Sequence, residues 1–326
     1  MKKVLVIRFS SFGDIVQASH IINPLIEKFP DVKIDWLTKV EFKNLVECFS
    51  GLNDVISFDK DLGLIGLIKL GFKLSKNDYH LVYDAHNNTR SLILRLIFFF
   101  CGLKVIKREK SRWKRVLLFR FRINKFDWPF KGALSYLKPL ELCKGNNQNW
   151  NLEEHKVTLP YEKFIVLAPS AAWEMKRWPL DHWKSLIKIM KDHRFIVVGG
   201  PKDDFCAELE AIDPTRVKNV AGSVSLNQSS YIVKKSDGIV SADTGIIHVA
   251  DAIGAKGISL IGPTAFGYCS GEHIKTLEVE LSCKPCSKDG RGSCSQEVYQ
   301  KCMVDITPER VASCAIDFFS SSKEDY

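Results

Sequence analysis

The chain has 326 residues, of which 45% are hydrophobic and 26% are charged. These values are typical of a globular protein with two domains, and they exclude a disordered, collagen-like or disulfide-scaffold chain. The formal net charge of +9 is compatible with a nucleic acid, an anionic membrane surface or an acidic substrate as a partner.

Most of this positive charge lies in one part of the chain. Residues 1–155 contain 26 Lys and Arg against 16 Asp and Glu, whereas the remaining residues are close to neutral. Within residues 104–125, ten side chains are basic and a single one, Glu109, is acidic. This segment therefore carries an excess as large as that of the whole protein.

The first half of the chain alternates short β-branched runs with longer helical patterns, which predicts a parallel sheet covered by helices. The expected elements are a strand at Val4–Arg8, a helix at Asp14–Lys28, a strand at Val32–Leu37 and a buried strand at Leu81–Ala85. The apolar run Leu92–Leu103 is about half as long as a membrane span and contains Arg95, so we expect a buried helix there.

The N-terminal residues do not form a signal-peptide pattern. Met-Lys-Lys is followed by a short apolar run, Val4–Ile7, and then by Arg8. We therefore expect a cytoplasmic protein, and in that reducing compartment the ten cysteines are expected to be thiols or metal ligands.

A polar, turn-rich segment at Lys144–Glu154 indicates a linker, and a second series of strands follows it. These strands are expected at Phe164–Ala168, Phe195–Gly199, Gly238–Ser241 and Gly257–Ile261. The pattern predicts two doubly wound α/β domains, residues 1–152 and 153–326. Because ligands of such sheets bind beyond the carboxyl ends of the strands, the loops at those ends are the candidate sites.

Two of these loops lie in the first domain. Residues 9–14 place small residues and then Asp14 before a helix, which fits either a helix N-cap or a functional carboxylate. Residues 84–91 gather an acid, an imidazole, two amides and a guanidinium. That set suits a polyhydroxylated or phosphorylated ligand, and it suits a capped helix start equally well.

Three further loops lie in the second domain. Residues 168–179 combine Ser170 with Lys176 and Arg177, and the two cations are suited to a phosphate group. Residues 241–248 place Thr244 and Gly245 at a helix N-terminus, which favours a diphosphate. The third loop is Gly262-Pro263-Thr264.

Two residues of the second of these loops have alternative interpretations. Asp243 is either part of the ligand site or a helix cap. His248, one turn into the helix, is either a ligand contact or a partly buried core histidine.

The motifs in these loops, taken together, resemble glycosyltransferase family 9, the bacterial lipopolysaccharide heptosyltransferase family. They are R-x-S-S-x-G-D at 8–14, D-x-x-x-x-x-R-S at 84–91, K-x-W-P at 176–179, V-G-G-P at 198–201, N-V-A-G at 219–222 and S-x-D-T-G-x-x-H at 241–248. The resemblance implies a GT-B fold, in which two Rossmann-like domains face each other across a cleft. It also implies inverting, metal-independent transfer of heptose from ADP-heptose to the inner core of lipopolysaccharide, as Kdo-lipid A or heptosyl-Kdo-lipid A.

The resemblance further implies that the first domain takes the acceptor and the second the nucleotide sugar, with Asp14 as the general base. Combined with the chemistry of the loops, it gives the expected donor contacts Ser170, Lys176, Asp243, Thr244, Gly245 and His248. The expected acceptor contacts are Ser10, Ser11, Gly13, His86, Asn87 and Arg90.

Two other hypotheses compete with this one. The chain could use a different nucleotide sugar, or it could be a glycolipid-binding or nucleic-acid-binding module without catalysis. Retention of Asp14, Lys176 and the Asp243-Thr244-Gly245 loop favours an enzyme.

The basic segment 104–125 interleaves its cations with apolar residues such as Trp113. Because no nucleic-acid-binding motif accompanies it, we expect no nucleic acid partner. A solvated helix face is one interpretation, and a docking surface for an anionic glycolipid at the cytoplasmic face of the inner membrane is the other. In the second case Arg112, Lys114 and Arg115 would make the contacts, and the protein would be peripherally associated with that membrane.

Four cysteines lie close together near the C-terminus, in the pattern Cys283-x2-Cys286-x7-Cys294-x7-Cys302. Four thiolates at such spacing could hold a structural Zn²⁺, and free thiols are the alternative. A catalytic metal is not expected. The final helix, beginning at Pro308, is expected to return to the first domain, as the GT-B resemblance implies.

Overall fold

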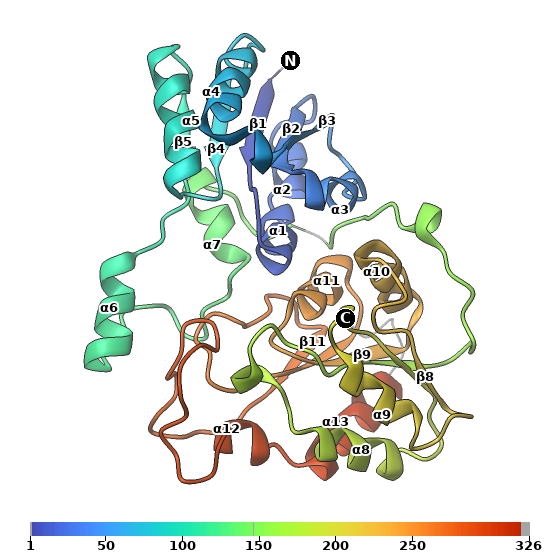
Figure 1. Cartoon of the computed structure of the whole chain (residues 1–326). Helices are drawn as coiled ribbons and strands as arrows, with labels where there is room; N and C mark the ends of the chain where they lie inside the picture. Colours follow the sequence, from blue (N-terminus) through green and yellow to red (C-terminus); the bar gives the residue numbers. More distant parts are fainter. Residues whose placement is uncertain (1, 146, 321–326) are drawn as a thin grey trace. The chain divides into compact units, whose positions relative to one another are not determined.

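The computed structural model describes residues 2–145 and 147–320. The chain divides into two compact α/β units, one made of Met1–Ser111 with Ala133–Asn151 and the other of Arg112–Gly132 with Leu152–Tyr326. Each unit contains its own parallel sheet with helices against it (Figure 1).

The first unit is built on a five-stranded parallel sheet in the order β3-β2-β1-β4-β5. Its strands are β1 (Lys3–Ile7), β2 (Lys33–Lys39), β3 (Asp54–Phe58), β4 (Leu81–Asp84) and β5 (Val105–Lys107). Both faces of β1 are buried, as expected for a central strand covered by helices. The strand order reverses between β1 and β4, so the loops after these two strands diverge and leave room for a ligand.

The helices of this unit are α1 (Phe12–Ser19), α2 (Ile22–Lys28), α3 (Lys43–Glu47), α4 (Gly63–Leu74), α5 (Thr89–Phe100) and α7 (Leu134–Leu137). Short 3-10 turns occur at Val40–Phe42, Lys60–Leu62 and Lys138–Leu140. The single helix predicted over residues 14–28 is in fact two helices. Pro24 has no backbone N–H to donate to the carbonyl of His20, and it is tolerated because it lies in the first turn of α2.

The second unit is built on a six-stranded parallel sheet in the order β11-β10-β9-β6-β7-β8. Its strands are β6 (Ile165–Ala168), β7 (Phe195–Val197), β8 (Val217–Asn219), β9 (Gly238–Ala242), β10 (Gly257–Leu260) and β11 (Ile274–Leu277). The order reverses between β6 and β9, and the loops after these strands are the ones that carry Lys176 and Asp243. The prediction of two doubly wound parallel sheets is confirmed.

The helices of the second unit are α6 (Arg112–Phe121), α8 (Leu180–Ile189), α9 (Ala207–Glu210), α10 (Leu226–Lys235), α11 (Gly245–Ile253), α12 (Lys301–Val304) and α13 (Pro308–Ser320). Short 3-10 turns occur at Glu153–His155, Glu174–Lys176 and Asp204–Cys206.

The segment 112–132, which contains α6, belongs to the second unit although it interrupts the sequence of the first. The sequence predicts this segment in a first domain spanning 1–152. It joins the second unit instead because its aromatic residues pack there. The rings of Phe126 and Phe130 lie edge-on to Phe266 at centroid distances of 5.4 and 5.0 Å. The Trp128 ring lies 5.3 Å from that of Tyr268.

The C-terminal helix is part of the second unit. Helix α13 packs against α8, and its buried residues Val311, Ala312, Ala315 and Phe318 belong to the core of that unit. Lys256 adds a hydrogen bond to the carbonyl oxygen of Phe318 at 3.1 Å. The apolar side of α13 is thus covered by residues of its own unit. Its expected return to the first domain stays a prediction.

Helix α5, predicted to be buried, is buried on one side only. Leu94 and Phe98 lie in the core of the first unit, whereas Phe99 and Phe100 are exposed. Among the described residues, no helix is both long and apolar enough to cross a membrane.

Trp178, in the K-x-W-P motif, is a structural residue that fixes the start of α8. It is fully buried, its ring is nearly perpendicular to that of Trp183 at 4.9 Å, and its Nε1 donates a hydrogen bond to the carbonyl oxygen of Ile306 at 2.8 Å. The ring therefore links α8 to the turn before α13.

We predict that Trp178→Phe lowers the free energy of unfolding of the second unit by about 1–3 kcal/mol, because the Ile306 carbonyl is left buried without its donor. Trp178→Ala should cost about 3–5 kcal/mol through the cavity it creates. The measurement is chemical denaturation, with Trp173→Phe as the exposed control. Equal midpoints for Trp178→Phe and the control would mean that the hydrogen bond contributes no stability.

Candidate active site

Asp14 lies in the first turn of α1, directly after the loop that follows β1. The N-cap of this helix is Ser11, so Asp14 is not the cap itself. The hydroxyl of Ser11 donates to Oδ2 of Asp14 at 2.9 Å. The interpretation of Asp14 as a simple N-cap is therefore wrong, and its carboxylate faces other partners.

Two of those partners come from distant parts of the chain. Nη2 of Arg8 lies 2.5 Å from Oδ2 of Asp14, and the hydroxyl of Tyr136 donates to Oδ1 at 3.2 Å. The Arg8 side chain is 4% exposed, whereas that of Asp14 is 40% exposed. The carboxylate thus rests on a buried guanidinium and presents its open side to solvent.

The charges around Asp14 keep it ionised. Desolvation by the protein would raise the pKa of this carboxyl, but the guanidinium groups of Arg8 and Arg108 hold the pKa well below its usual range. The hydrogen bonds from Ser11 and Tyr136 act in the same direction. Asp14 is consequently a carboxylate at neutral pH.

Tyr136 is in turn held by Arg108. Burial raises the pKa of Tyr136 to about 12, although Arg108 opposes the rise, so its hydroxyl remains a donor. The Arg108 guanidinium lies 3.7 Å from the ring centroid of Tyr136 and donates to the hydroxyl of Ser135 at 2.7 Å. These contacts fix the ring that orients Asp14.

The loop after β4 is organised around the buried carboxylate of Asp84. Its Oδ1 accepts the backbone N–H groups of His86 and Asn87 at 3.0 and 2.7 Å, and Nε of Arg95 lies 3.1 Å from its Oδ2. Asn88 and Ser91 form a capping box at the start of α5. The start of α5 is therefore capped, and the ligand contacts expected in this loop stay a prediction.

Asn87 and His86 have definite places within that loop. Asn87 has a positive φ of 48° and donates its side-chain amide to the carbonyl oxygen of Arg108 at 2.7 Å. The ring of His86 packs edge-on against Phe9 at 5.6 Å. Burial, with the charges of Arg8 and Lys110, lowers the pKa of His86 to about 3, so the imidazole is neutral at pH 7.

Within residues 2–145 and 147–320, Nδ1 of His86 is buried and has no hydrogen-bond partner. The other residues expected to contact an acceptor are more accessible. Ser10 and Gly13 are half-buried, whereas Ser11 and Arg90 are exposed. Arg90 lies in the first turn of α5, while the ion pair to Asp84 is made by Arg95.

In the second unit, Lys176 and Asp243 form a buried ion pair. Nζ of Lys176 lies 3.0 Å from Oδ2 of Asp243, which also accepts a hydrogen bond from the Thr264 hydroxyl at 2.7 Å. Burial alone would raise the pKa of Asp243, but the positive charges and hydrogen-bond donors around it, Lys176 first among them, together lower it. The expected loops after β6, β9 and β10 are therefore connected through one carboxylate.

The N-terminal end of α11, beside this ion pair, has backbone N–H groups that can bind an anion. Thr244 is the N-cap of α11, which begins at Gly245, and its side chain makes no capping hydrogen bond in the described structure. The first N–H groups of a helix have no partner within the helix, and the helix dipole adds positive potential there. Lys176 and the start of α11 thus have the chemistry of a phosphate site.

His248 and Ser170 have different relations to this site. His248 is buried, with Nε2 3.8 Å from Oδ1 of Asp243 and Nδ1 3.6 Å from Sγ of Cys269. It contacts the carboxylate from the protein interior, which fits its interpretation as a core histidine. Ser170 is half-buried just after β6.

The loop 282–300 supports Lys176, a relation the sequence analysis did not include. A Cβ atom on Gly290, whose φ is +93°, would come within 2.6 Å of Cγ of Lys176, so only glycine fits this approach. Gln300 donates its side-chain amide to the carbonyl oxygen of Glu174 in the turn that holds Lys176. The guanidinium of Arg291 lies over the ring of Trp173 at 4.9 Å.

The structural Zn²⁺ site expected at the four cysteines of this loop stays a prediction, because in the described part of the chain no three of their sulfur atoms lie within 4.8 Å of one another. Among the residues that the structure describes, one group of three ligand-type side chains lies within 4.8 Å, and it is His248, Asp251 and Cys269. The Asp251 oxygens there already accept the N–H groups of Ser270 and Gly271 at 2.8 and 2.7 Å. None of these four cysteines, Cys283, Cys286, Cys294 and Cys302, is in a disulfide. Burial and the neighbouring cysteine thiols raise the pKa of Cys286 and Cys302, so the four thiols share one neighbourhood.

The basic residues expected to dock on a membrane are only partly available. Arg112 is exposed at the start of α6. Lys114 is half-buried and lies 5.8 Å from the ring centroids of Trp113 and Phe126, and the guanidinium of Arg115 lies over the Phe266 ring at 5.0 Å. Two of the three cations are thus used in packing within the second unit.

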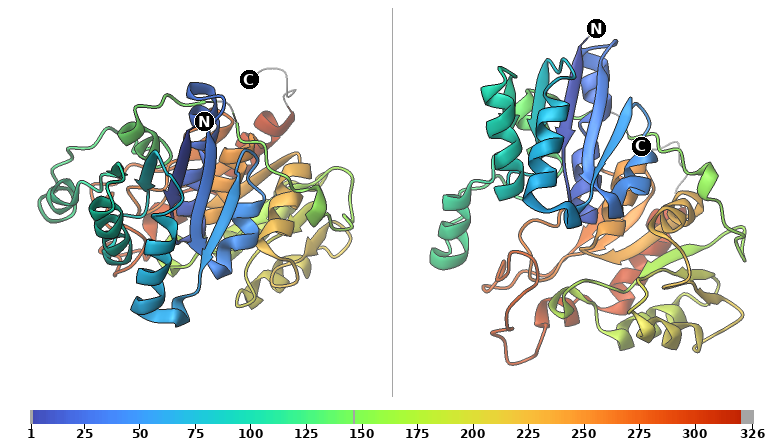
Figure 2. Two further views of the ribbon diagram at one scale, coloured as in Figure 1. Left: turned by 90° about the horizontal axis from the view of Figure 1, so that it is seen from above. Right: turned by 45° about the horizontal axis from the view of Figure 1, so that its top comes forward.

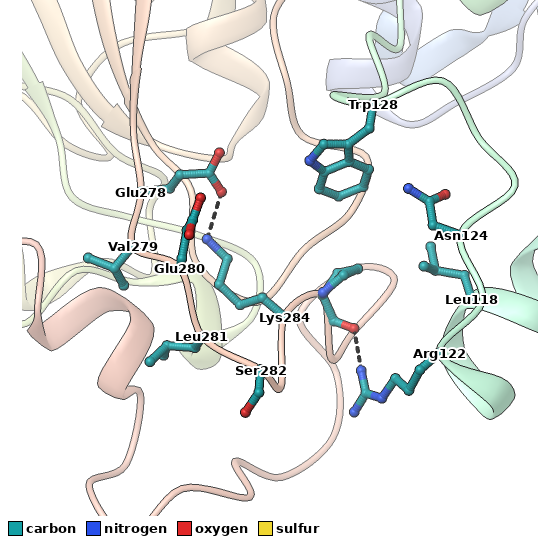
Figure 3. A pocket seen from close by; sticks show the side chains of 11 residues that line it. Leu118, Arg122, Asn124, Trp128, Glu278, Val279, Glu280, Leu281, Ser282 and Lys284 are labelled. Carbon is teal, nitrogen blue, oxygen red and sulfur yellow. Dashed lines mark hydrogen bonds and ion pairs between the residues drawn. The ribbon is translucent and has the colours of Figure 1, made fainter.

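The second unit also has an open pocket of about 590 Å³. Figure 3 shows Trp128 and Asn124 on one side of it and Glu278 and Glu280 on the other. Lys284 is paired with Glu278 at 2.7 Å, so its charge is already neutralised. The pocket lining contains none of the predicted site residues.

Three residues of the Asp14 centre were missing from the predicted site. Arg8 stands in the first motif, and a cation directly after a buried strand is a usable signal. Arg108 is hidden among the ten basic residues of 104–125, and only its 7% exposure separates it from them. Tyr136 lies in a short helix after the basic segment and has no sequence signal.

Comparison with known proteins agrees with the motifs. The family model described as glycosyltransferase family 9 (heptosyltransferase) matches residues 138–299. Lipopolysaccharide heptosyltransferase 2 of Escherichia coli K12 is 25% identical over 342 residues, which cover 95% of this chain and 96% of that protein.

Solved structures show the same fold. The Escherichia coli ADP-heptose lipopolysaccharide heptosyltransferase II superposes with a TM-score of 0.72 at 20% identity, covering 98% of each chain. A family 9 glycosyltransferase from Veillonella parvula superposes with a TM-score of 0.74 at 16% identity, again covering 98% of each chain. The expected GT-B fold is confirmed. With the parallel sheets, the motif loops and these relatives taken together, the chain belongs to glycosyltransferase family 9 and is a glycosyltransferase.

Proposed function

We propose that this protein transfers heptose from ADP-heptose to the inner core of lipopolysaccharide, either Kdo-lipid A or heptosyl-Kdo-lipid A. The names of the relatives support this substrate pair. The observation that carries the proposal is the pairing of Lys176 with Asp243 beside the uncapped start of α11, because this is the arrangement that a nucleotide diphosphate requires.

In the proposed reaction, the acceptor hydroxyl oxygen attacks the anomeric carbon of the heptose from the face opposite the diphosphate. The new C–O bond forms as the bond from carbon to the phosphate oxygen breaks, so the configuration is inverted. The hydroxyl proton goes to Asp14, and ADP leaves with the electron pair of the broken bond. No metal is needed if protein groups stabilise the leaving diphosphate.

Asp14 is always ionised but, because Arg8 lowers its pKa, it is a weak base. A weak base is sufficient when the hydroxyl proton is transferred only after the new C–O bond has begun to form. As the acceptor oxygen bonds to the anomeric carbon it becomes positively charged, and its proton then becomes far more acidic than that of a free hydroxyl. Asp14 therefore orients the hydroxyl first and accepts its proton as the bond forms.

Lys176 supplies charge to the departing diphosphate. In the structure its ammonium group is held by Asp243 at 3.0 Å, which fixes its position before a ligand arrives. The N–H groups that begin α11 after Thr244, at Gly245 and beyond, point their dipoles at the same anion. Ser170 contributes at the rim, and His248 acts through Asp243, whose carboxylate it contacts from inside.

The acceptor is assigned to the loops around Asp14, with Ser10, Ser11, Gly13, His86, Asn87 and Arg90 as contacts. The unpartnered Nδ1 of His86 supports this assignment, because a neutral imidazole can hydrogen-bond a sugar hydroxyl. Such an acceptor is held in a membrane, and we propose that the enzyme works at the cytoplasmic face of the inner membrane. Arg112, Lys114 and Arg115 would meet its anionic groups, with Arg112 the most accessible of the three.

Replacing the base tests the reaction directly. We expect Asp14→Asn to lower kcat by about 10²–10⁴-fold without weakening ADP binding, because only proton acceptance is lost. The assay follows ADP release from ADP-heptose with Kdo-lipid A, and Asp31→Asn, an exposed carboxylate, is the matched control. Undiminished turnover in Asp14→Asn would reject Asp14 as the base.

Replacing the lysine tests the donor site. Lys176→Ala should raise the KM for ADP-heptose by about ten- to a hundredfold, because a charge-assisted contact to the diphosphate is removed. Wild-type protein should be stabilised against heat by ADP more than by UDP or GDP. Lys176→Ala should lose that stabilisation, while Lys188→Ala, which removes an exposed cation of α8, should keep it. Stabilisation by UDP or GDP alone would point to another nucleotide sugar.

The charge of Arg8 predicts a pH dependence. Since the pKa of Asp14 is held well below its usual range, protonation of Asp14 does not limit wild-type kcat/KM between about pH 5 and 7. Arg8→Met removes the nearest positive charge, the pKa of Asp14 rises, and activity should then fall as the pH decreases below about 5. Arg8→Lys should restore the flat profile; an identical acid limb in Arg8→Met and Arg8→Lys would argue against this role for the charge.

A further inference from the structure

Helices α4 and α5 lie side by side in the first unit (Figure 1, Figure 2). Their inner sides carry Leu67, Leu74, Leu94 and Phe98 into the core. Gly71 allows the two helices to approach closely, since a Cβ there would lie 2.8 Å from Cδ1 of Ile97. The two helices therefore form a single packed surface layer.

The outer side of this layer is apolar. On α4 the exposed fractions are 57% for Leu64, 70% for Ile65 and 52% for Phe72. On α5 the exposed residues follow helical spacing at Leu92, Leu96, Phe99 and Phe100, with 68% and 82% for the two phenylalanines. We call these seven side chains the α4–α5 face. Seven large apolar side chains exposed on two adjacent helices mark a binding surface rather than ordinary solvent exposure.

The charges on the two helices are of one sign. Residues 63–74 and 89–100 contain Lys69, Lys73, Arg90 and Arg95 and no Asp or Glu. Arg95 is used internally by its ion pair with Asp84, whereas Lys69, Lys73 and Arg90 are exposed. The acidic residues closest in sequence are Asp59 and Asp61, before α4, and Asp78, after it.

The exposed apolar side chains and the positive charge of α4 and α5 together indicate which partner binds this face. A second copy of the chain on the α4–α5 face would bring cations against cations, and neither helix offers an acid to pair with them. An anionic bilayer instead accepts the phenylalanine and aliphatic side chains at the level of its headgroups and attracts the lysines and the arginine. We propose that the α4–α5 face is a membrane-insertion surface for anionic lipid.

This proposal deepens the proposed function, because it says which face of the enzyme meets the membrane that holds the acceptor. It assigns the apolar part of the contact to α4 and α5, whereas the cations predicted from sequence lie at the start of α6. Phe99 and Phe100 end α5 and are followed by Gly102, whose φ of +78° turns the chain, so the two rings stand at the end of the helix.

The test is co-sedimentation of the full-length protein with vesicles of phosphatidylcholine alone and of phosphatidylcholine with about one third phosphatidylglycerol. Wild type should bind the anionic vesicles, and Phe99→Gln/Phe100→Gln should bind them at least about tenfold more weakly, because two inserted rings are lost. The matched control is Val298→Gln/Ile316→Gln, which changes two exposed apolar residues elsewhere and should bind like wild type.

A second measurement separates this proposal from the proposed function. Turnover with a soluble, delipidated acceptor should be unchanged in Phe99→Gln/Phe100→Gln, while turnover with vesicle-held acceptor should fall. Absence of any transfer by wild type would reject the proposed function but leave the vesicle result standing. Equal vesicle binding by the variant and wild type, or a wild-type dimer that the variant converts to monomer in sedimentation velocity, would overturn the membrane assignment.

Discussion

The buried guanidinium of Arg8 is the interaction on which the first unit's site depends. It sits at the end of β1, donates to the carbonyl oxygen of Ala85 at 2.9 Å and pairs with Asp14 at 2.5 Å. A buried charge is tolerated only when it is paired and hydrogen-bonded, so Arg8 must hold both the loop after β4 and the carboxylate of α1. Arg8 thus contributes both to the position and to the charge of Asp14.

The site of the second unit also depends on a buried charged side chain, but there the charge is negative. There the buried group is the carboxylate of Asp243, and Lys176 and Thr264 satisfy it from the loops after two other strands. In both units, strands that diverge at the reversal of sheet order leave room for a ligand, and one paired charge fixes the loops around that room. The first unit offers a carboxylate and the second an anion site, which are the two groups that an inverting glycosyl transfer requires.

Many of the positively charged side chains of this protein make contacts within the fold. Arg108 orients Tyr136, Arg115 lies over Phe266, and Arg122 donates to the carbonyl oxygens of Cys283 and Pro285 at 3.0 and 2.7 Å. These arginines stabilise the fold, and so the count of basic residues overstates the charge available to a partner. The cations of α4 and α5 are fewer, but they surround exposed apolar side chains.

Sequence alone determined the alternation of strands and helices, the two parallel sheets, the family and the loops that carry Asp14, Lys176 and Asp243, because periodicity and motifs are local properties of the chain. Tertiary structure decided what no local pattern contains. Tyr136 reaches Asp14 across 122 positions, and the segment 112–132 joins the second unit through aromatic packing. It also decided which side of α5 is exposed, since the apolar residues of this helix are not confined to one side and so do not specify the face that the core will cover.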